Sequence, residues 1–298
     1  MNVQKTILLT GASGFVGQHL SMLLVDRGFR VVALDQKPSL LPGVESLCAD
    51  LGDPKSLEAL PRVWWGVIHL AAASVPSLFA TPAPVVSNLQ ITLNLLEHLE
   101  SARVLLVSSC HVYGPADTLR REEDPIVPQG RYGLSKHLCE QLLPHYLQKL
   151  DLRVARPFNH LGPGMRPELM IPSLVRRIQE HPPEDRSPLR MHGLNSVRDF
   201  IDVRDIASAY LAILELDDPR ERTFNVCTGM GHSIEQIAYA ALEIVGAKRS
   251  VAFESHPNSP DDIPFLVGDP SRLQAASSWK PSFPLAESLR AVLKSINS

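Results

Sequence analysis

Tyr132 and Lys136 form the pair of side chains whose type and spacing point most directly to chemistry. They are four positions apart in a stretch with helical periodicity, so both side chains share one face of the expected helix, one turn apart. A nearby ammonium lowers the pKa of a phenol from about 10 toward neutrality. The pair is therefore suited to exchanging a proton with a hydroxyl or a carbonyl while a hydride moves to or from a nicotinamide.

Ser109 and His111 follow an apolar run that we expect to be a strand over residues 103–108. Ligands of doubly wound sheets lie outside the carboxyl ends of the strands, so Ser109 can point into the same crevice as Tyr132. Its hydroxyl can also serve only to cap the turn. His111 is able to do acid–base work near neutral pH, or it packs beside the site without moving a proton. The sequence leaves both alternatives open.

A glycine loop with the spacing G-x-x-G-x-x-G begins at Gly11 and continues through Gly14 to Gly17. It lies between an expected strand over 5–10 and an expected helix that runs to about Gly28. Glycines let such a turn close, and the free N–H groups at the helix N-terminus bind a pyrophosphate. A tight turn without a ligand is the simpler alternative, but the position between strand and helix favours a dinucleotide.

Asp35 closes the next expected strand, 30–35, about 18 residues after Gly17. An acidic side chain at this position accepts hydrogen bonds from the hydroxyls of the adenosine ribose. No arginine follows it, so a 2′-phosphate would meet the carboxylate unfavourably, although Lys37 could partly compensate. The sequence predicts NAD rather than NADP as the cofactor.

The elements that must position these residues alternate along the first half of the chain. Further strands are expected over 44–49, 67–71 and 152–157, and helices over 85–100 and 131–149. Strands that alternate with helices imply right-handed crossovers and a parallel sheet. The strands are apolar on both faces, as in a sheet covered on both sides. We therefore expect an α/β protein with a doubly wound parallel sheet.

The alternation fails after residue 158, where Pro and Gly cluster and only 172–179 resembles a helix. We assign residues 1–157 to the dinucleotide-binding domain and 158–298 mainly to a smaller lobe over the carboxyl edge of the sheet. Segment 198–226 is expected to return to the large domain as a helix over 203–216 and a strand over 223–226.

Composition restricts the class of protein further. The 298 residues carry a net charge of −3, which excludes a nucleic-acid binder that acts by bulk electrostatics. No apolar run approaches the ~18 residues that cross a bilayer, and no secretory signal is visible. The four cysteines are far apart and the histidines form no metal motif, so we expect no metal site and a cytoplasmic location.

Taken together, these residues resemble the extended short-chain dehydrogenase/reductases that act on nucleotide sugars, and the resemblance covers essentially the whole chain. It implies a Rossmann-type domain with a smaller C-terminal substrate-binding lobe. The motifs that carry it are Gly11–Gly17, Asp35, His69-Leu70-Ala71-Ala72, Asn88, Ser109 with Val112-Tyr113-Gly114, Tyr132 with Lys136, Arg156-Pro157-Phe158-Asn159 and Arg198-Asp199-Phe200.

The resemblance also implies a role for each candidate residue. Ser109 and Tyr132 would hold the C4 oxygen of the sugar, and Lys136 would also hold the nicotinamide ribose. Asp50 and Leu51 would flank the adenine. The remaining cofactor contacts would come from Gly11, Gly14, Phe15, Val16, Gly17, Asp35, Leu70, Ala71, Ala72 and Asn88, and those to the sugar nucleotide's base and diphosphate from Phe158, Asn159 and Arg198. Family members pair the helices expected over 85–100 and 131–149 with their copies, so a homodimer is expected.

Departures from the family pattern bear on the activity. His111 occupies the position where dehydratases usually have Glu, Arg131 replaces a common proline, and Ser259-Pro260-Asp261-Asp262 stands where Arg-Pro-x-Asp is frequent. Stretch 156–164 most resembles 4-keto-6-deoxy-mannose reductases that use GDP sugars, whereas 110–118 resembles a dehydratase. Because Asp35 favours a recycled NAD, a 4-epimerase is the first choice. A 4-keto-6-deoxy-sugar reductase and a dehydratase are the alternatives, and a non-catalytic dinucleotide sensor is a remote one.

Overall fold

The computed structural model describes residues 4–181, 184–254 and 263–296. A seven-stranded parallel sheet forms the larger part of the molecule, in the order β10-β6-β5-β4-β1-β2-β3. This arrangement confirms the expected doubly wound α/β fold. The strands are β1 (Thr6–Thr10), β2 (Arg30–Asp35), β3 (Val44–Cys48), β4 (Val63–His69), β5 (Ser101–Val107), β6 (Asp151–Pro157) and β10 (Thr223–Val226).

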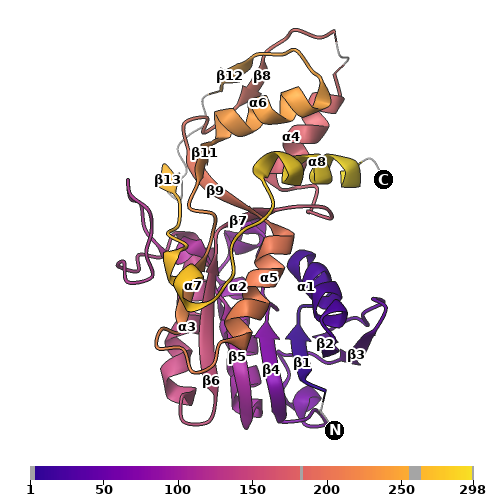
Figure 1. Ribbon diagram of the computed structural model, residues 1–298, viewed down its shortest axis with the longest axis vertical. Coiled ribbons are helices and arrows are strands. Elements are labelled where there is room, and N and C mark those ends of the chain that lie inside the picture. Colours follow the sequence, from indigo (N-terminus) through magenta and orange to yellow (C-terminus); the bar gives the residue numbers. More distant parts are fainter. Residues whose placement is uncertain (1–3, 182–183, 255–262, 297–298) are drawn as a thin grey trace.

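Helices cover both faces of this sheet (Figure 1). On one face, α1 (Phe15–Asp26) and α5 (Val203–Glu215) pack on side chains such as Ile7 and Leu9. On the other, α2 (Ala83–His98) and α3 (Gly130–Leu142) pack on side chains such as Leu8. Successive residues of β1 thus enter different cores, which explains why the strand is apolar throughout.

A smaller lobe stands at one end of the sheet (Figure 1). Its core joins α4 (Met170–Gln179), α6 (Ile234–Val245) and α8 (Leu285–Ile296). Its strands are β7 (Asn159–Leu161), β8 (Leu189–Met191), β9 (Val197–Asp202), β11 (Gly231–Ser233), β12 (Val251–Phe253) and β13 (Phe265–Leu266). The remaining short helices of the molecule, most of which lie in the larger domain, are η1 (Pro54–Leu57), η2 (Pro76–Ala80), η3 (Cys110–Val112), η4 (Leu143–Tyr146) and α7 (Ser271–Ala276).

The chain passes from the lobe back to the sheet at the junction of β9 and α5. β9 pairs with β7, β11 and β13 in the lobe, whereas α5 covers the large sheet and β10 extends its edge beside β6. The domain boundaries proposed from the sequence remain a prediction.

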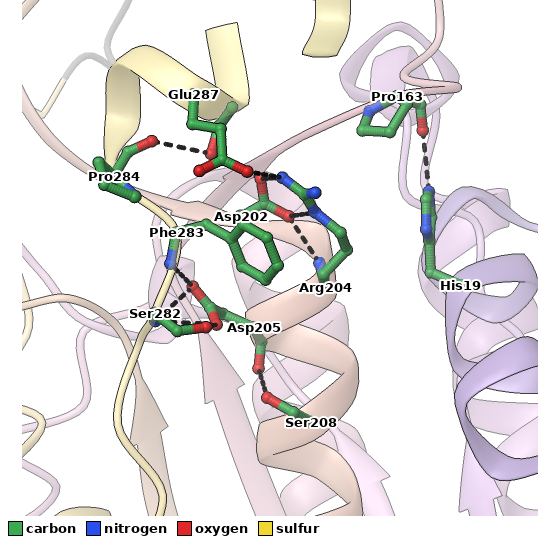
Figure 2. Close-up of polar contacts among 11 residues, drawn as sticks. His19, Pro163, Asp202, Arg204, Asp205, Ser208, Ser282, Phe283, Pro284 and Glu287 are labelled. Atoms are coloured by element: carbon green, nitrogen blue, oxygen red, sulfur yellow. Dashed lines mark hydrogen bonds and ion pairs between the residues drawn. The ribbon is translucent and has the colours of Figure 1, made fainter. Parts of the chain in front are cut away.

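Two carboxylates at the start of α5 fasten this junction to the C-terminal helix (Figure 2). Asp202 caps α5 through the Arg204 N–H, and it also accepts a hydrogen bond of 2.6 Å from the Ser288 hydroxyl on α8. Asp205 accepts bonds from the backbone of Ser282 and Phe283 just before α8. The start of α5 therefore holds α8 in place.

A second fastening lies beside α1. Figure 2 shows the His19 ring of α1 beside Pro163, and the His19 Nε2 lies 2.8 Å from the Pro163 carbonyl oxygen. This contact connects the lobe to the helix that follows the glycine loop.

Two element predictions need correction. The helix expected over 131–149 ends at Leu142 and continues only as the short η4, because Pro144 lacks the N–H that an α-helix needs and its ring clashes with the preceding turn. The strand expected over 67–71 starts earlier, at Val63, and ends at His69. Among the helices of the described ranges, none is long and apolar enough to cross a membrane.

Candidate active site

A cavity of about 1560 Å³ lies between the carboxyl ends of the sheet strands and the lobe. Every residue that the sequence singled out for catalysis or binding lines it, so the fold brings the whole set together. They are Gly11, Gly14, Phe15, Val16, Gly17, Asp35, Asp50, Leu51, Leu70, Ala71, Ala72, Asn88, Ser109, His111, Tyr132, Lys136, Phe158, Asn159 and Arg198. Their individual roles remain predictions.

The glycine loop has the geometry of a phosphate cradle. Gly11 has φ +70°, and a Cβ on Gly17 would lie 2.3 Å from the Gly11 carbonyl oxygen, so a larger residue at position 17 would force the turn open. The N-cap of α1 is Gly14, and no side chain in the described ranges caps this helix. The first amides of α1, at Phe15 and Val16, are therefore donors suited to an anion.

Asp35 stands at the end of β2 on the cavity wall. Its carboxylate accepts hydrogen bonds from the Ser13 hydroxyl, at 2.5 Å, and from the Gln36 N–H, at 2.8 Å. Asp50 lies nearby, where its Oδ1 accepts from the Gly52 N–H at 2.8 Å. The two carboxylates make this end of the cavity suited to hydroxyl groups that donate hydrogen bonds. Their negative charge makes it unfavourable for a 2′-phosphate.

His69 sets the turn that carries Leu70, Ala71 and Ala72 to the cavity. Burial lowers the pKa of this histidine to about 3, so its ring is neutral. Its Nδ1 lies 2.8 Å from the Thr10 hydroxyl, which also accepts from the Ala71 N–H. The end of β4 is thereby tied to the end of β1.

Tyr132 lies at the centre of a cluster formed with Ser109 and His111. A hydrogen bond joins its hydroxyl to Ser109, whose Oγ also accepts from the His111 N–H at 3.2 Å. The His111 ring lies edge-on to the Tyr132 ring, with centroids 5.7 Å apart. A Cβ on Gly133 would lie 2.2 Å from the His111 carbonyl oxygen, so only glycine lets α3 approach η3 this closely.

The pKa of Tyr132 corrects the expectation from the sequence. Burial raises it to about 12, and the hydrogen bond with Ser109 only partly opposes this. Lys136 does not lower it to neutrality: its Nζ donates to the Val107 carbonyl at 2.8 Å, and burial lowers the pKa of the lysine itself. Burial thus favours the protonated phenol, which suits a proton donor.

Two predicted ligands have their side chains engaged elsewhere. The Asn88 amide accepts from the Ala73 N–H at 2.7 Å and donates to the Ala73 carbonyl, so it fixes the loop after β4. The Phe158 ring is 1% exposed and packs in a core with Tyr113. Asn88 thus shapes the cavity by fixing the loop at Ala73. Phe158 lines the cavity, but almost all of its surface is buried in the protein.

The substrate side of the cavity includes Asn159 and Arg198. Arg198 Nη1 donates to the Val197 carbonyl, and the neighbouring Asp199 is buried and accepts from Thr228. Burial raises the pKa of Asp199. The stretch 259–262, where the family pattern often has an arginine, lies outside the described residues.

Several cavity residues escaped the sequence interpretation. Phe79 lies in the short helix η2 and Arg166 in an irregular segment, and neither segment is long enough to show periodicity. Tyr210 looks like one more core residue of α5. For Arg166, a cation shortly after the Gly162–Gly164 turn was the available signal. In the described ranges, no cluster of three or more His, Cys, Asp or Glu side chains has the arrangement of a metal site.

This chain belongs to the NAD dependent epimerase/dehydratase family, whose model matches residues 7–227. It is an enzyme of this nucleotide-sugar family, in which epimerases and reductases share one fold. The GDP-6-deoxy-D-mannose reductase of Pseudomonas aeruginosa is 32% identical over 302 residues, 97% of this chain and 96% of that protein.

Solved structures show the same fold over almost the whole chain. MoeE5 in complex with UDP-glucuronic acid and NAD has a TM-score of 0.85 and 27% identity, covering 98% of this chain and 99% of that one. RMD from Pseudomonas aeruginosa complexed with NADPH has a TM-score of 0.82 and 30% identity, with the same coverage.

Proposed function

We propose that this protein reduces the C4 ketone of a nucleoside-diphosphate 4-keto-6-deoxy-hexose, with a GDP sugar as the first candidate. The observation that carries the proposal is the placement of the Tyr132 phenol beside Ser109 in the cavity that also holds the glycine loop. The 32% identity to a GDP-6-deoxy-D-mannose reductase supports the choice of sugar. The stretch from Arg156 to Gly164, which resembles such reductases, is consistent with this choice.

The chain's own groups supply the proton and stabilise the oxygen. Tyr132 donates its proton to the C4 oxygen as the carbonyl becomes an alcohol, and the Ser109 hydroxyl steadies the developing charge on the same oxygen. Lys136 places a positive charge one helical turn from the phenol. A reduced nicotinamide, when bound, supplies the hydride.

The glycine loop and Asp35 fit a dinucleotide, and we propose that it is NADH. The amides of Phe15 and Val16 would hold the pyrophosphate, and the Asp35 carboxylate would accept from the adenosine ribose. A carboxylate at this place opposes a 2′-phosphate, even though the related RMD is complexed with NADPH.

A 4-epimerase is the second candidate, because Asp35 favours a cofactor that is kept and recycled. The UDP-glucose 4-epimerase of Halalkalibacterium halodurans is 26% identical over 317 residues, 95% of this chain and 92% of that protein. Epimerisation begins with oxidation, however, for which Tyr132 must first lose its proton. Burial raises the pKa of this phenol, which opposes that loss.

Reduced nicotinamide deuterated at its transferable position distinguishes the candidates. The protein would be incubated with GDP-, UDP- and dTDP-linked 4-keto-6-deoxy-hexoses and, in separate reactions with oxidised cofactor, with the corresponding nucleotide-linked hexoses that carry hydroxyls at C4 and C6. The products would be analysed by NMR and mass spectrometry. A reductase gives one deuterium at C4 for each cofactor oxidised. Inversion of a 4-hydroxy sugar without deuterium uptake would instead establish the epimerase, and loss of water the dehydratase; either outcome would refute the reductase.

A further inference from the structure

The loop over residues 73–82 forms one wall of the cavity beside Tyr132. Ala73, Val75 and Phe79 all line the cavity from this loop, and its short helix η2 ends at Ala80. The last carbonyls of a helix have no partner within it, so their binding must come from elsewhere. The group that binds the last carbonyls of η2 therefore determines the position of this part of the cavity wall.

Arg131 supplies both hydrogen bonds. Its Nη1 donates to the Phe79 carbonyl at 3.0 Å and to the Ala80 carbonyl at 2.7 Å, one N–H to each. Arg131 is the second residue of α3 and directly precedes Tyr132. Asn88 fixes the other end of the loop at Ala73, so α2 and α3 hold the two ends separately.

Phe79 connects the segment that Arg131 binds to the Tyr132 side chain. Its ring is 7% exposed and stands edge-on to the Tyr132 ring, with centroids 5.5 Å apart. The His111 ring contacts Tyr132 in a similar edge-on manner. The Tyr132 ring thus contacts one aromatic ring from η2 and one from η3, and Arg131 binds only the backbone that carries the first.

We propose that Arg131 is a positioning residue for the C4 chemistry: it clamps Phe79 against Tyr132 and thereby fixes the orientation of the phenol. The inference rests on the proposed function for its kinetic readout. The loop contact itself is independent of it. Arg131 stands where the family pattern often has proline, which has no side-chain donor for such a clamp.

The test compares Arg131→Met with Arg131→Lys and Phe79→Leu. Met keeps the length of the stem but loses both hydrogen bonds, and Lys restores a donor. Arg176→Met is the matched control, since Arg176 also donates to a loop carbonyl, that of Pro167, but does not line the cavity. Hydrogen exchange of the amides in 74–82, kcat, KM and thermal midpoints would be measured for each variant.

We expect Arg131→Met to speed amide exchange in 74–82 and to lower kcat about 10- to 100-fold, the scale of a small misplacement of reacting groups. The KM for the nucleotide sugar should change little, and Arg131→Lys should recover part of kcat. Phe79→Leu should lower kcat similarly. The double variant Arg131→Met/Phe79→Leu should be no worse than the single ones, as two parts of one clamp require.

Three outcomes would overturn the clamp: unchanged exchange in 74–82, fully additive losses in the double variant, or a raised KM with unchanged kcat, which would make Arg131 a direct substrate ligand. If the unaltered protein reduces no 4-keto sugar, the proposed function fails. The exchange measurement still decides whether Arg131 holds the loop.

Discussion

At the scale of single residues, we predict that the charge on Asp35 selects the cofactor. Hydrogen bonds to charged groups contribute about 1.5–3 kcal/mol, so the carboxylate should favour NADH over NADPH by roughly ten- to a hundredfold. Asp35→Asn should narrow that ratio, and Asp53→Asn, which alters a carboxylate at the cap of η1, should leave it unchanged. Fluorescence titrations with both cofactors measure the ratio; tighter binding of NADPH by the unaltered protein would refute this assignment.

The phenol of Tyr132 makes a prediction about pH. Reduction needs the protonated phenol, and a pKa raised to about 12 keeps it protonated far above neutrality. The pH profile of kcat/KM, which reports groups of the free enzyme, should therefore show no loss from this group between about pH 6 and 10. A loss should follow only as pH rises toward 12. A Tyr132-dependent decline centred near pH 7, with the fold intact by circular dichroism, contradicts the raised pKa.

At the residue scale the sequence predicted which candidate residues line the cavity, but not their electrostatics. The Tyr132–Lys136 spacing follows from helix geometry, which is local. The pKa of Tyr132 depends on enclosure by η2, η3 and the lobe, which no local pattern contains. Phe79 was missed for the same reason, since its segment has neither helical nor strand periodicity.

Among the elements, the start of α5 makes the clearest prediction about stability. The Ser288 hydroxyl donates to Asp202 at 2.6 Å in a buried contact (Figure 2 shows the surrounding network). Ser288→Ala should lower the free energy of unfolding by about 1.5–3 kcal/mol, the usual contribution of a hydrogen bond to a charged group. Ser278→Ala, at an exposed serine, should have little effect. Denaturant unfolding measures both, and equal effects would contradict the role of Asp202.

The same contact gives a pH dependence with a definite sign. Burial alone would raise the pKa of Asp202, but hydrogen bonds from Arg204 and Ser288 outweigh burial and lower it. A carboxylate with a lowered folded pKa stabilises the protein above its unfolded pKa of about 3.9, and this stabilisation is lost as pH falls through the folded value. The difference between Ser288→Ala and the unaltered protein should therefore shrink below about pH 4.

Element boundaries were predicted best where the chain is apolar and ends in a polar turn. The expected strands 30–35 and 223–226 match β2 and β10. The overlong helix after residue 131 shows the limit of periodicity, because apolar residues continue in step past Pro144 while the backbone cannot. The lobe was harder, since its strands are short and pair with segments distant in the sequence.

For the whole molecule, we predict a homodimer formed by α2 and α3. Leu95 of α2, and Leu143 of η4 directly after α3, are buried in the core beneath the sheet and are not available to such an interface. Val86 on α2 remains 63% exposed. At a twofold interface its replacement by a charged residue acts on both subunits at once.

Light scattering should give twice the 32.8 kDa of one chain for the unaltered protein. Val86→Arg should shift it toward the monomer, whereas Leu40→Arg, at a site 93% exposed outside these helices, should not. A monomer at micromolar concentration for the unaltered protein would rule out this interface.

The central claim is that Tyr132 donates the proton when hydride reaches C4 of the sugar, and Tyr132→Phe tests it most directly. The change keeps the ring and its contacts with Phe79 and His111 but removes the proton. Single-turnover transfer of deuterium from reduced nicotinamide to the 4-keto sugar should slow ~10²–10⁴-fold, with cofactor binding unchanged. Tyr239→Phe, at an exposed tyrosine of α6, should retain the full rate. Transfer at the full rate in Tyr132→Phe would contradict the assignment of this phenol as the proton donor.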